Sequence, residues 1–550
     1  MQSIWRTWPQ DPERAAQLAQ GLRLHPVTGQ LLLNRTVASR EEAARFIEPA
    51  LARLEEPWAL SGMEGTVHRI RQAIARQEPV VIFGDSDVDG LTASVILYEV
   101  LKGEGASVRA IQSNRLTDGY GLPASLVQRL CRSSTKLLIL VDCGTNQSED
   151  VQRLADHSID TIVVDHHVPL AAPARPHALI NPYCGGAGRG LSSAGLAFKV
   201  AHALLGGTDP ERIAPYLDLA ALGTLADCCP LLGDARILVT AGLPRIVRSH
   251  RAGLRRLCDA TRTGEPEPEQ VIRRLIPRLN ASGRLGDAGA VWHLLLSGES
   301  ARLEEWLGAV ADAHATTKQL RREVMGQAEA QVSRLHFRDQ FVMVVGRAGW
   351  PQGLMGPLAA QLAQRYGRPA IAIALGERHG IGSGRSIPRF NLFEALKACQ
   401  DLLVRFGGHA QACGLTVERK ALDRFHEVVN EHGRQVLGRE GLLPSRMVDL
   451  DLPLSGLAQR WVEEVQRLAP FGQGNPRPTI AIRRVTVEVK SPRRADLFDG
   501  TLRVSARGTF EALAAGACYD VLASPSLDDG ELVLTVSDVK VSQPPVSARG

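Results

Sequence analysis

The sequence predicts an α/β fold class: a parallel-sheet domain joined by a long helix to a smaller α/β domain, followed by an all-β barrel. Three observations support this prediction. Short apolar runs alternate with helical stretches in the first half, the alternation resumes after a long polar helical stretch, and the last part changes to short strands separated by turns. The 550 residues suffice for roughly three or four domains. A content of 44% hydrophobic and 22% charged residues excludes a disordered or fibrous chain.

The first half is expected to contain an N-terminal helical segment, residues 1–75, packed on a catalytic domain over residues 76–300. Within that domain three apolar runs, residues 80–84, 136–144 and 161–167, are separated by helical stretches. Such alternation is typical of parallel strands with helices on both faces. Ligands of these sheets bind beyond the carboxyl ends of the strands, so the residues that follow the three strands are expected to converge on one edge.

The second half is expected to begin with a connecting helix over residues 301–335. A second strand–helix unit opens at residues 340–346 and continues through 369–375, which predicts a smaller α/β domain over residues 336–445. The pattern then changes to alternating strands with turns. This change predicts a small β-barrel over residues 446–545.

The composition also excludes some locations. No stretch reaches about 18 consecutive apolar residues, so no transmembrane helix is predicted. The N-terminus lacks the apolar core of a secretory signal, so the expected location is the cytoplasm. The nine cysteines form no C-x-x-C pair, and we interpret them as small buried residues in a reducing compartment.

An acidic cluster, Asp85, Asp87 and Asp89 in GDSDVDG, follows the first apolar strand. Three carboxylates this close repel one another, and a divalent cation is the usual means of holding them together. A solvated acidic turn is the plainer alternative. An EF-hand is excluded because its twelfth loop position, which needs a glutamate, is Ile96. A phosphatase with Asp87 as a covalent nucleophile is a better rival, but it gives no reason for the other clusters of acids and histidines.

Those clusters are Asp142 after the second strand, Asp165 with His166 and His167 after the third, and Asp227 in LGTLADCCP. A single histidine is more often structural than functional. Two histidines beside an aspartate at a strand end, matched by acids at two other strand ends, favour a metal site. Mixed carboxylate and imidazole ligands suit Mn²⁺, and Mg²⁺ where carboxylates dominate. The candidate ligands are more numerous than one ion requires. Two ions about 3.5–4 Å apart are the arrangement that catalyses hydrolysis of phosphate esters.

The charge distribution adds one further feature. The chain carries a net charge of only +5, but the stretch from Leu243 to Arg284 contains ten arginines and four acids. It could be a phosphate-binding stripe or simply the solvated face of helices.

Four segments in the order GDSDVDG, VDCGT, VDHH and LGTLAD resemble the four motifs of the DHH phosphoesterase superfamily. The segment FGGHAQACG resembles the substrate-binding DHHA1 domain of that superfamily. Within it, the chain is most similar to the RecJ exonuclease family. The supporting segments are RLHPVTGQLLLNR, EEAARFIEP, LSSAGLAFK, PRLNASGRLGDA, SGRSIPRFNLFEAL and APFGQGNPRP.

The resemblance implies a nuclease that uses Mn²⁺ or Mg²⁺ to degrade single-stranded DNA from 5′ to 3′ into mononucleotides, in recombination and repair. It also implies two lobes with a groove between them and a C-terminal OB-fold, where Phe498, Phe510 and Tyr519 are the candidates for base stacking. Expected partners are single-stranded DNA, a helicase and a single-strand-binding protein, with no membrane, and nothing demands more than a monomer. The alternatives are a phosphodiesterase for oligoribonucleotides or cyclic dinucleotides, and a non-catalytic single-strand-binding scaffold.

The resemblance also implies roles for individual residues. Asp142 is expected to bridge two ions, and Asp165 to orient a neighbouring histidine. The implied metal ligands, all catalytic except the first, are Asp85, Asp87, Asp89, Asp142, His166, His167 and Asp227. The implied substrate-binding residues are Arg278, Asn280, Arg284, Arg385, Ser386, Gly407, Gly408 and His409.

Three positions depart from the pattern of the family. Ser86 stands where an aromatic residue is usual, Ser193 stands where a glycine is expected, and the segment around Trp350 lacks its histidine. None of these changes removes an implied metal ligand.

Overall fold

The computed structural model forms two compact units. One contains residues 1–53, 230–236 and 443–550, and the other contains residues 54–229 and 237–442. The structure describes residues 3–542 except 118, 120, 170, 171, 207–209, 265, 266, 297, 299, 335–339, 439–441, 443, 444, 458, 511, 512, 515 and 516. The expected domain boundary at 335/336 and the expected barrel end at 545 therefore lie outside the described residues.

The larger unit contains a five-stranded sheet whose strands all run parallel. Its order is β3-β2-β4-β5-β6, so the chain adds β3 on one side of β2 and then crosses to the other side to form β4. The switch point between β2 and β4 is where ligands bind in sheets of this kind. The strands are β2 (Val80–Gly84), β3 (Val108–Gln112), β4 (Leu137–Val141), β5 (Asp160–Val164) and β6 (Ala178–Ile180).

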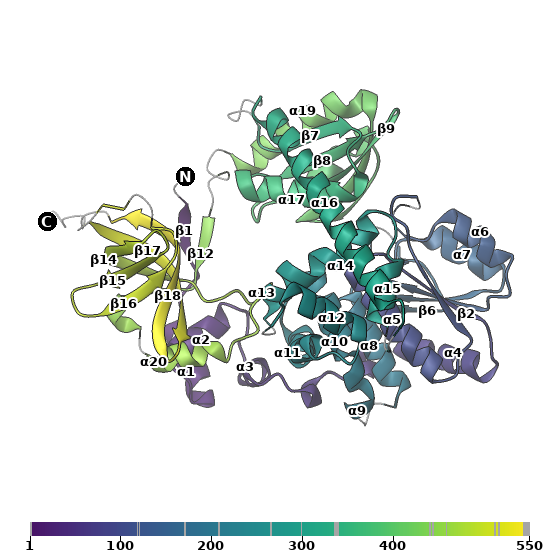
Figure 1. The fold of residues 1–550 in the computed structure, drawn as a ribbon, viewed down its shortest axis with the longest axis horizontal. Helices are drawn as coiled ribbons and strands as arrows, with labels where there is room; N and C mark the ends of the chain where they lie inside the picture. The colour runs from purple at the N-terminus through teal and green to yellow at the C-terminus, as the bar shows by residue number, and fades with distance from the viewer. Residues whose placement is uncertain are drawn as a thin grey trace. The chain divides into compact units, whose positions relative to one another are not determined.

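Helices cover both faces of this sheet (Figure 1). On one face, α6 (Ala124–Cys131) and α7 (Ser148–Asp156) pack on the apolar side chains of β2, β4 and β5. On the other face, α5 (Val88–Gly103) packs against α8 (Ser193–Leu204) and α10 (Leu217–Ala226).

The close approach of α10 to α5 depends on Gly223. A Cβ added there would lie 2.6 Å from Asp89 Oδ1 and 2.4 Å from Ala194 Cβ, so no larger residue fits without a shift. The three helices therefore meet beside the acidic cluster.

The same unit contains a second sheet of order β10-β11-β9-β8-β7, in which only the β7–β8 pair is parallel. The long helix α16 (Leu303–Val332) leads into it and spans most of the stretch predicted as a connecting helix (Figure 1). Apolar clusters cover both faces of this sheet. The strands are β7 (Met343–Ala348), β8 (Ala370–Leu375), β9 (His379–Arg385), β10 (Leu403–His409) and β11 (Ala412–Glu418), with α17 (Met355–Tyr366) and α19 (Leu422–Leu437) beside them.

The smaller unit is built on a closed barrel, because β14 pairs with both β15 and β17. Its strands are β13 (Leu450–Asp451), β14 (Ile480–Ser491), β15 (Arg494–Phe498), β16 (Arg503–Arg507), β17 (Cys518–Asp528) and β18 (Glu531–Val541). The fold class predicted from the sequence, a parallel-sheet domain, a smaller α/β domain and an OB-type barrel, is confirmed.

The N-terminal segment differs from the prediction. Helices α1 (Pro12–Leu22), α2 (Pro26–Leu33) and α3 (Arg40–Ile47) share one apolar core with the barrel, and only α4 (Met63–Ala75) packs in the larger unit. The expected packing of residues 1–75 as one piece on the catalytic domain is therefore corrected. An amphipathic sequence pattern predicts that one face of a helix packs on an apolar surface, but it does not identify that surface.

Two further expectations need correction. Cys184, Cys228 and Cys518 are exposed, so these three cysteines are not small core residues. Phe510 and Tyr519 are only 2% and 4% exposed and belong to the barrel core, so they are not available for base stacking. Within the described part of the chain, no helix combines the length and the apolar character that a bilayer crossing requires.

Candidate metal centre

The acidic segment that follows β2 is buried at the carboxyl edge of the parallel sheet. Asp85 and Asp89 are each 2% exposed. Asp87 is the N-cap of α5, and its Oδ1 accepts a hydrogen bond from Gly90 N at 3.1 Å. An aspartate is among the preferred residues at this position because its carboxylate satisfies a free backbone N–H. The strand-to-helix turn thus places all three carboxylates at the switch point of the sheet.

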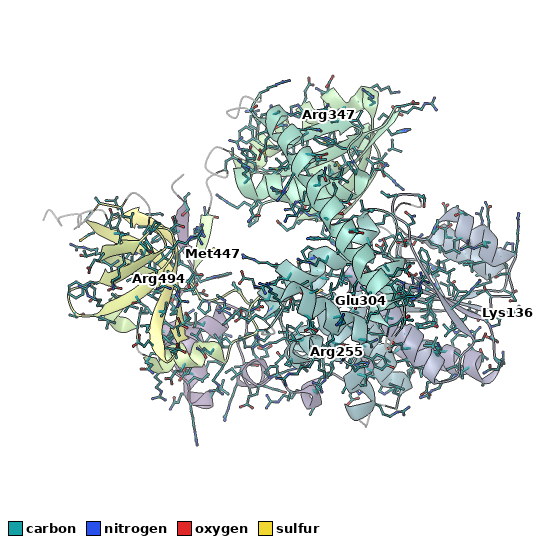
Figure 2. All side chains as sticks on the ribbon, viewed as in Figure 1. Lys136, Arg255, Glu304, Arg347, Met447 and Arg494 are labelled. Carbon is teal, nitrogen blue, oxygen red and sulfur yellow. The ribbon has the colours of Figure 1, made fainter. Side chains whose placement is uncertain are left out.

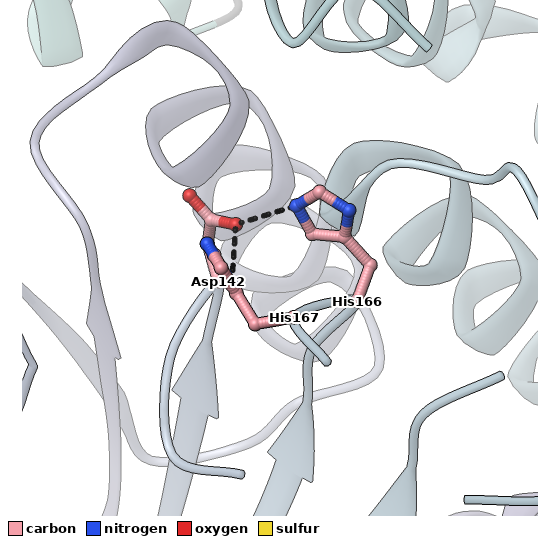
Figure 3. Close-up of side chains that lie close together, drawn as sticks. All are labelled: Asp142, His166 and His167. Carbon is pink, nitrogen blue, oxygen red and sulfur yellow. Dashed lines mark ion pairs between the residues drawn. The ribbon is translucent and has the colours of Figure 1, made fainter. Parts of the chain in front are cut away.

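Asp142, His166 and His167 come from the ends of β4 and β5 and face one another (Figure 3). His166 Nε2 lies 3.4 Å from Asp142 Oδ1 and 3.7 Å from Asp227 Oδ2. His167 Nδ1 lies 4.0 Å from Asp142 Oδ1. Asp142 has a φ of +62°, a left-handed conformation that is unusual for a residue with a side chain and is found often at functional sites.

The described residues with ligand atoms form three overlapping groups, in each of which these atoms lie within 4.8 Å of one another. Asp142 and His166 each belong to two groups, so the groups form one continuous cluster. Asp89 is outside them, but its Oδ2 lies 3.9 Å from His166 Nε2. The groups are Asp85–Asp87–Asp142, Asp142–His166–His167 and His166–Asp227–Cys229. The structure therefore brings together all seven residues that the sequence suggests as metal ligands.

Asp165 contacts His167 in the way the sequence predicts. His167 Nδ1 lies 2.7 Å from Asp165 Oδ1, which also accepts a hydrogen bond from His166 N at 2.8 Å. A carboxylate that accepts from Nδ1–H fixes the ring orientation, so that the other ring nitrogen, once deprotonated, is the one that can bind a metal. Burial opposes the charged imidazole, but the Asp165 contact outweighs it and raises the pKa of His167 to about 9.

Burial and the close packing of carboxylates raise the pKa of two of them. Burial and the neighbouring Asp227 raise the pKa of Asp89 to about 6. Burial and the nearby Asp87 raise the pKa of Asp142 well above its usual value. Each of these carboxylates is destabilised by low polarity and like charge, and both effects would be offset by a cation among them. The donor set of carboxylates and imidazoles fits Mn²⁺, or Mg²⁺ at its carboxylate-rich side.

Arg115 is a site residue that the sequence reasoning did not find. Its Nε donates to Asp85 Oδ1 at 2.9 Å, and its Nη2 donates to Asp87 Oδ2 at 2.9 Å. Burial raises the pKa of Asp85, but the charge and hydrogen bonds of Arg115, together with hydrogen bonds from Ser113 and Ser86, lower that pKa overall. Arg115 follows β3, an edge strand with the mixed sequence VRAIQ. That strand is not a continuous apolar run, so the signal used for the other strands misses it.

Ser193, the residue that stands in place of an expected glycine, contacts two of the acids. Its backbone N donates to Asp89 Oδ2 at 2.8 Å, and its Oγ donates to Asp142 Oδ1 at 2.8 Å. Ala194 N donates to the other oxygen of Asp89 at 2.9 Å. The amino end of α8 is therefore directed at Asp89, where free N–H groups and the helix dipole favour negative charge.

The predicted substrate residues of α14 (Ile276–Arg284) have different positions. Asn280 Oδ1 accepts a hydrogen bond from Val88 N at 3.0 Å, so this side chain holds the start of α5. Arg284 is half-buried near the cluster, and burial together with Arg321 lowers its pKa to about 10. Arg278 is half-buried, and its guanidinium bonds to a backbone carbonyl one turn earlier.

The second sheet contributes His409 to the same place. The His409 ring stacks on the His167 ring with 6.5 Å between centroids and 19° between planes. Gly408 has a φ of +131°, and a Cβ there would lie 2.3 Å from Ala412 O, so a glycine is required beside this histidine. Gly407 pairs with Gly414 in the same hairpin.

In the SGRS segment at the end of β9, Arg385 and Ser386 make different contacts. Arg385 is half-buried and its Nη1 donates to Ser383 Oγ at 3.2 Å. Ser386 Oγ donates to Phe390 O at 2.7 Å, so its hydroxyl stabilises the following turn.

The basic stretch over residues 243–284 is not a uniform face. Arg251 is fully buried and bonded to Glu99 and Asp218, so its role is structural. Arg255 is exposed on the helical layer (Figure 2).

Comparisons with known proteins agree with this architecture. The N-terminal domain of the DHH family matches residues 79–224, the DHHA1 domain matches residues 339–433, and the RecJ OB domain matches residues 448–514. The single-stranded-DNA-specific exonuclease RecJ of Escherichia coli is 32% identical over 492 residues, which cover 83% of each protein.

The exonuclease RecJ of Bacillus subtilis is 33% identical over 491 residues, which cover 88% of this chain. The chain spans only 62% of the length of that relative. The structure of RecJ from Thermus thermophilus in complex with Mn²⁺ superposes with a TM-score of 0.83 at 26% identity, and the match covers 98% of this chain and 80% of that one.

Proposed function

The chain belongs to the RecJ family of single-stranded-DNA-specific exonucleases, and from this premise we propose that it hydrolyses the phosphodiester bonds of single-stranded DNA. Degradation proceeds from 5′ to 3′, releases 5′ mononucleotides and serves DNA recombination and repair. One observation carries the proposal: the cluster of carboxylate and imidazole side chains at the switch point of the parallel sheet, with His409 stacked against it.

The cluster is proposed to hold two divalent ions, with Mn²⁺ preferred to Mg²⁺. Asp142 is the proposed bridging ligand because its Oδ1 is near both histidines and it belongs to two of the three groups. When bound, such ions supply an activated water and stabilise the negative charge that develops on the phosphate. The proposed ligands are Asp85, Asp87, Asp89, Asp142, His166, His167 and Asp227.

The remaining residues of the site hold ligands or substrate in place. Asp165 fixes the His167 ring through its 2.7 Å contact with Nδ1. Arg284, Arg385 and His409 are the proposed contacts for the substrate phosphate. Arginine suits this role because its planar guanidinium binds phosphate oxygens in pairs and stays charged. Asn280 and Ser386 support the site through backbone contacts.

The test is a degradation assay with Mn²⁺ and labelled substrates: single-stranded DNA, blunt duplex DNA, single-stranded RNA, a dinucleotide and a cyclic dinucleotide. We expect rapid hydrolysis of single-stranded DNA alone. A 5′-terminal label should appear at once as mononucleotide, whereas a 3′-terminal label should remain on progressively shorter strands. The reverse order would contradict the proposed direction.

Asp142→Ala and a chelated sample should abolish hydrolysis, whereas Asp156→Ala, a change at an exposed carboxylate of α7, should not. Cleavage confined to short or cyclic nucleotides would replace the proposal with a small-substrate phosphodiesterase. Tight binding of the strand without hydrolysis would replace it with a scaffold.

The proposed partners are a helicase and a single-strand-binding protein that supply the strand, and the proposed state is a monomer in the cytoplasm. Light scattering of the purified chain tests the monomer, with a mass near 59.5 kDa expected.

A further inference from the structure

Cys229 places a sulfur atom within the metal-ligand cluster. Its Sγ lies 3.4 Å from Asp227 Oδ2, and His166 Nε2 lies 3.7 Å from the same oxygen. The ligand atoms of the three residues all lie within 4.8 Å of one another. Cys229 is 6% exposed, so its thiol is directed into the protein. One side of the cluster therefore offers nitrogen, oxygen and sulfur together.

The backbone after α10 decides which of the two adjacent cysteines reaches the cluster. Cys228 has a φ of +54°, a left-handed conformation that ends the helix, and Cys229 N then donates to Thr224 O at 3.2 Å. As a result Cys228 is exposed and Cys229 is buried. The pair provides a site residue and a matched control next to it in the sequence.

The three donors do not suit the same ions as the rest of the cluster. Mg²⁺ favours oxygen ligands and Mn²⁺ favours oxygen ligands together with some imidazole, whereas a thiolate selects softer ions. Zn²⁺ binds cysteine, histidine and aspartate in a tetrahedral arrangement and forms stronger complexes than Mn²⁺ in the general order of divalent metals. A group of one histidine, one carboxylate and one thiol leaves a fourth position for water.

We propose that His166, Asp227 and Cys229 bind Zn²⁺ as an inhibitory ion that competes with the Mn²⁺ or Mg²⁺ of the catalytic cluster. The inference rests on the ligand roles proposed above for His166 and Asp227. Zn²⁺ held by these two side chains withdraws them from the catalytic arrangement. The activity of the chain would then respond to the ratio of zinc to manganese, through a residue that the hydrolysis itself does not need.

The direct test uses Co²⁺ as a spectroscopic substitute for Zn²⁺ on the full chain, without DNA. Thiolate coordination produces a sulfur-to-cobalt charge-transfer band in the near ultraviolet. We expect the band in the wild type and in Cys228→Ser, its absence in Cys229→Ser, and its loss on addition of Zn²⁺. Zn²⁺ affinity, measured by calorimetry on each chain, should fall on the order of 10-fold or more in Cys229→Ser relative to Cys228→Ser. A band that persists in Cys229→Ser, or that disappears only in Cys228→Ser, would overturn the proposal.

A second measurement needs no change at Cys229. X-ray absorption at the zinc edge of the Zn²⁺-loaded Cys228→Ser chain should show a sulfur neighbour at about 2.3 Å, whereas nitrogen and oxygen neighbours alone lie at about 2.0–2.2 Å. The absence of sulfur there would refute the inference even if Cys229→Ser failed to fold, which circular dichroism would reveal.

Inhibition is measured separately, with single-stranded DNA and a fixed concentration of Mn²⁺. Each variant is compared with its own rate without zinc. We expect the zinc concentration for half inhibition to be about 10-fold higher in Cys229→Ser than in Cys228→Ser. A chain that binds Zn²⁺ through Cys229 but degrades no DNA would refute the proposed function and leave the zinc site standing. Equal sensitivity of the two variants would refute the inhibitory role.

Discussion

Two parts of the molecule bury charged side chains beside different neighbours. In the barrel-containing unit, Arg35 and Asp449 are 4% and 5% exposed and form an ion pair, with 3.3 Å between Nη1 and Oδ1. Arg35 Nε also donates to Asn475 Oδ1 at 2.7 Å. At the edge of the parallel sheet, Asp89 and Asp142 are equally buried, yet their charged neighbours include other carboxylates.

The difference separates structural charges from functional ones. A buried charge whose partners lie within the chain contributes to the fold, and removing one partner leaves the other uncompensated. Buried carboxylates that face one another gain their full stabilisation only from a cation. Four changes test this distinction, and they are ordered from the largest expected effect to the smallest.

Asp142→Asn should separate stability from activity. The uncharged side chain keeps the shape but removes a proposed ligand, so hydrolysis of single-stranded DNA should fall by more than about 100-fold. When a chelator keeps the chain free of metal, the same change removes like-charge repulsion and should raise the free energy of unfolding by about 1 kcal/mol. The thermal midpoint should then rise by roughly 2–4 °C. Calorimetry and the degradation assay check both. Asp156→Asn should alter neither, and an active Asp142→Asn variant would contradict the bridging role.

Arg35→Met should have the opposite signature. It leaves the buried Asp449 without its ion pair, so the free energy of unfolding should fall by about 3–5 kcal/mol. Urea unfolding followed by fluorescence measures this loss. As a control, Arg507→Met breaks an exposed pair with Asp528 and should cost less than about 1 kcal/mol. Equal losses for the two variants would remove the distinction between buried and exposed pairs.

Ser193→Ala removes the hydroxyl that donates to Asp142 Oδ1 at 2.8 Å. The carboxylate then loses an orienting contact, so Mn²⁺ affinity measured by calorimetry should fall on the order of 10-fold. Ser94→Ala is the control, because the Ser94 hydroxyl is buried without a hydrogen-bond partner among the described residues. An unchanged affinity in Ser193→Ala would show that the hydroxyl does not position the ligand.

Asp499→Asn should have the smallest effect, and one that depends on pH. Hydrogen bonds from Leu502 N at 2.8 Å and Thr501 N at 2.9 Å lower the pKa of Asp499 below its ordinary value of 3.8. A lowered pKa stabilises the fold above pH 3.8, and this contribution is lost as the pH falls through the folded-state pKa. At pH 7 the wild type should be more stable by no more than about 1 kcal/mol, because the group is solvated. Urea unfolding should show the gap closing below pH 3.8, and a constant gap would contradict the assignment.

Much of the site was open to prediction because it follows local rules. Apolar runs of β-branched residues predict buried parallel strands, and the residues that follow such strands meet at one edge. This is why Asp85, Asp142 and His166 are recognisable without a structure, whereas Asp227 lies at the end of helix α10 and is recognised from its motif. The hydrogen bond between Asp165 and a neighbouring histidine was open to prediction for the same reason, since only one residue lies between the partners.

Other features depended on packing between distant segments. Arg115 reaches Asp85 from the turn after an edge strand whose sequence lacks a clear period. Ser193 contacts Asp142 because α8 begins close to where β4 ends, although the two residues are 51 positions apart in sequence. The three N-terminal helices share their core with the barrel more than 400 residues later, a choice that amphipathicity alone does not make.

The sequence by itself therefore determined the central strands, the acids and histidines that follow them, and the class of ion that such donors bind. The tertiary structure alone decided which atoms meet: the pairing of Arg115 with two acids, the hydroxyl of Ser193 beside Asp142, and the thiol of Cys229 beside Asp227. The physical reason is the distance along the chain over which each feature is decided. Strand and helix patterns arise from neighbours in the chain, whereas a contact of about 3 Å requires the packing of entire elements to be settled first.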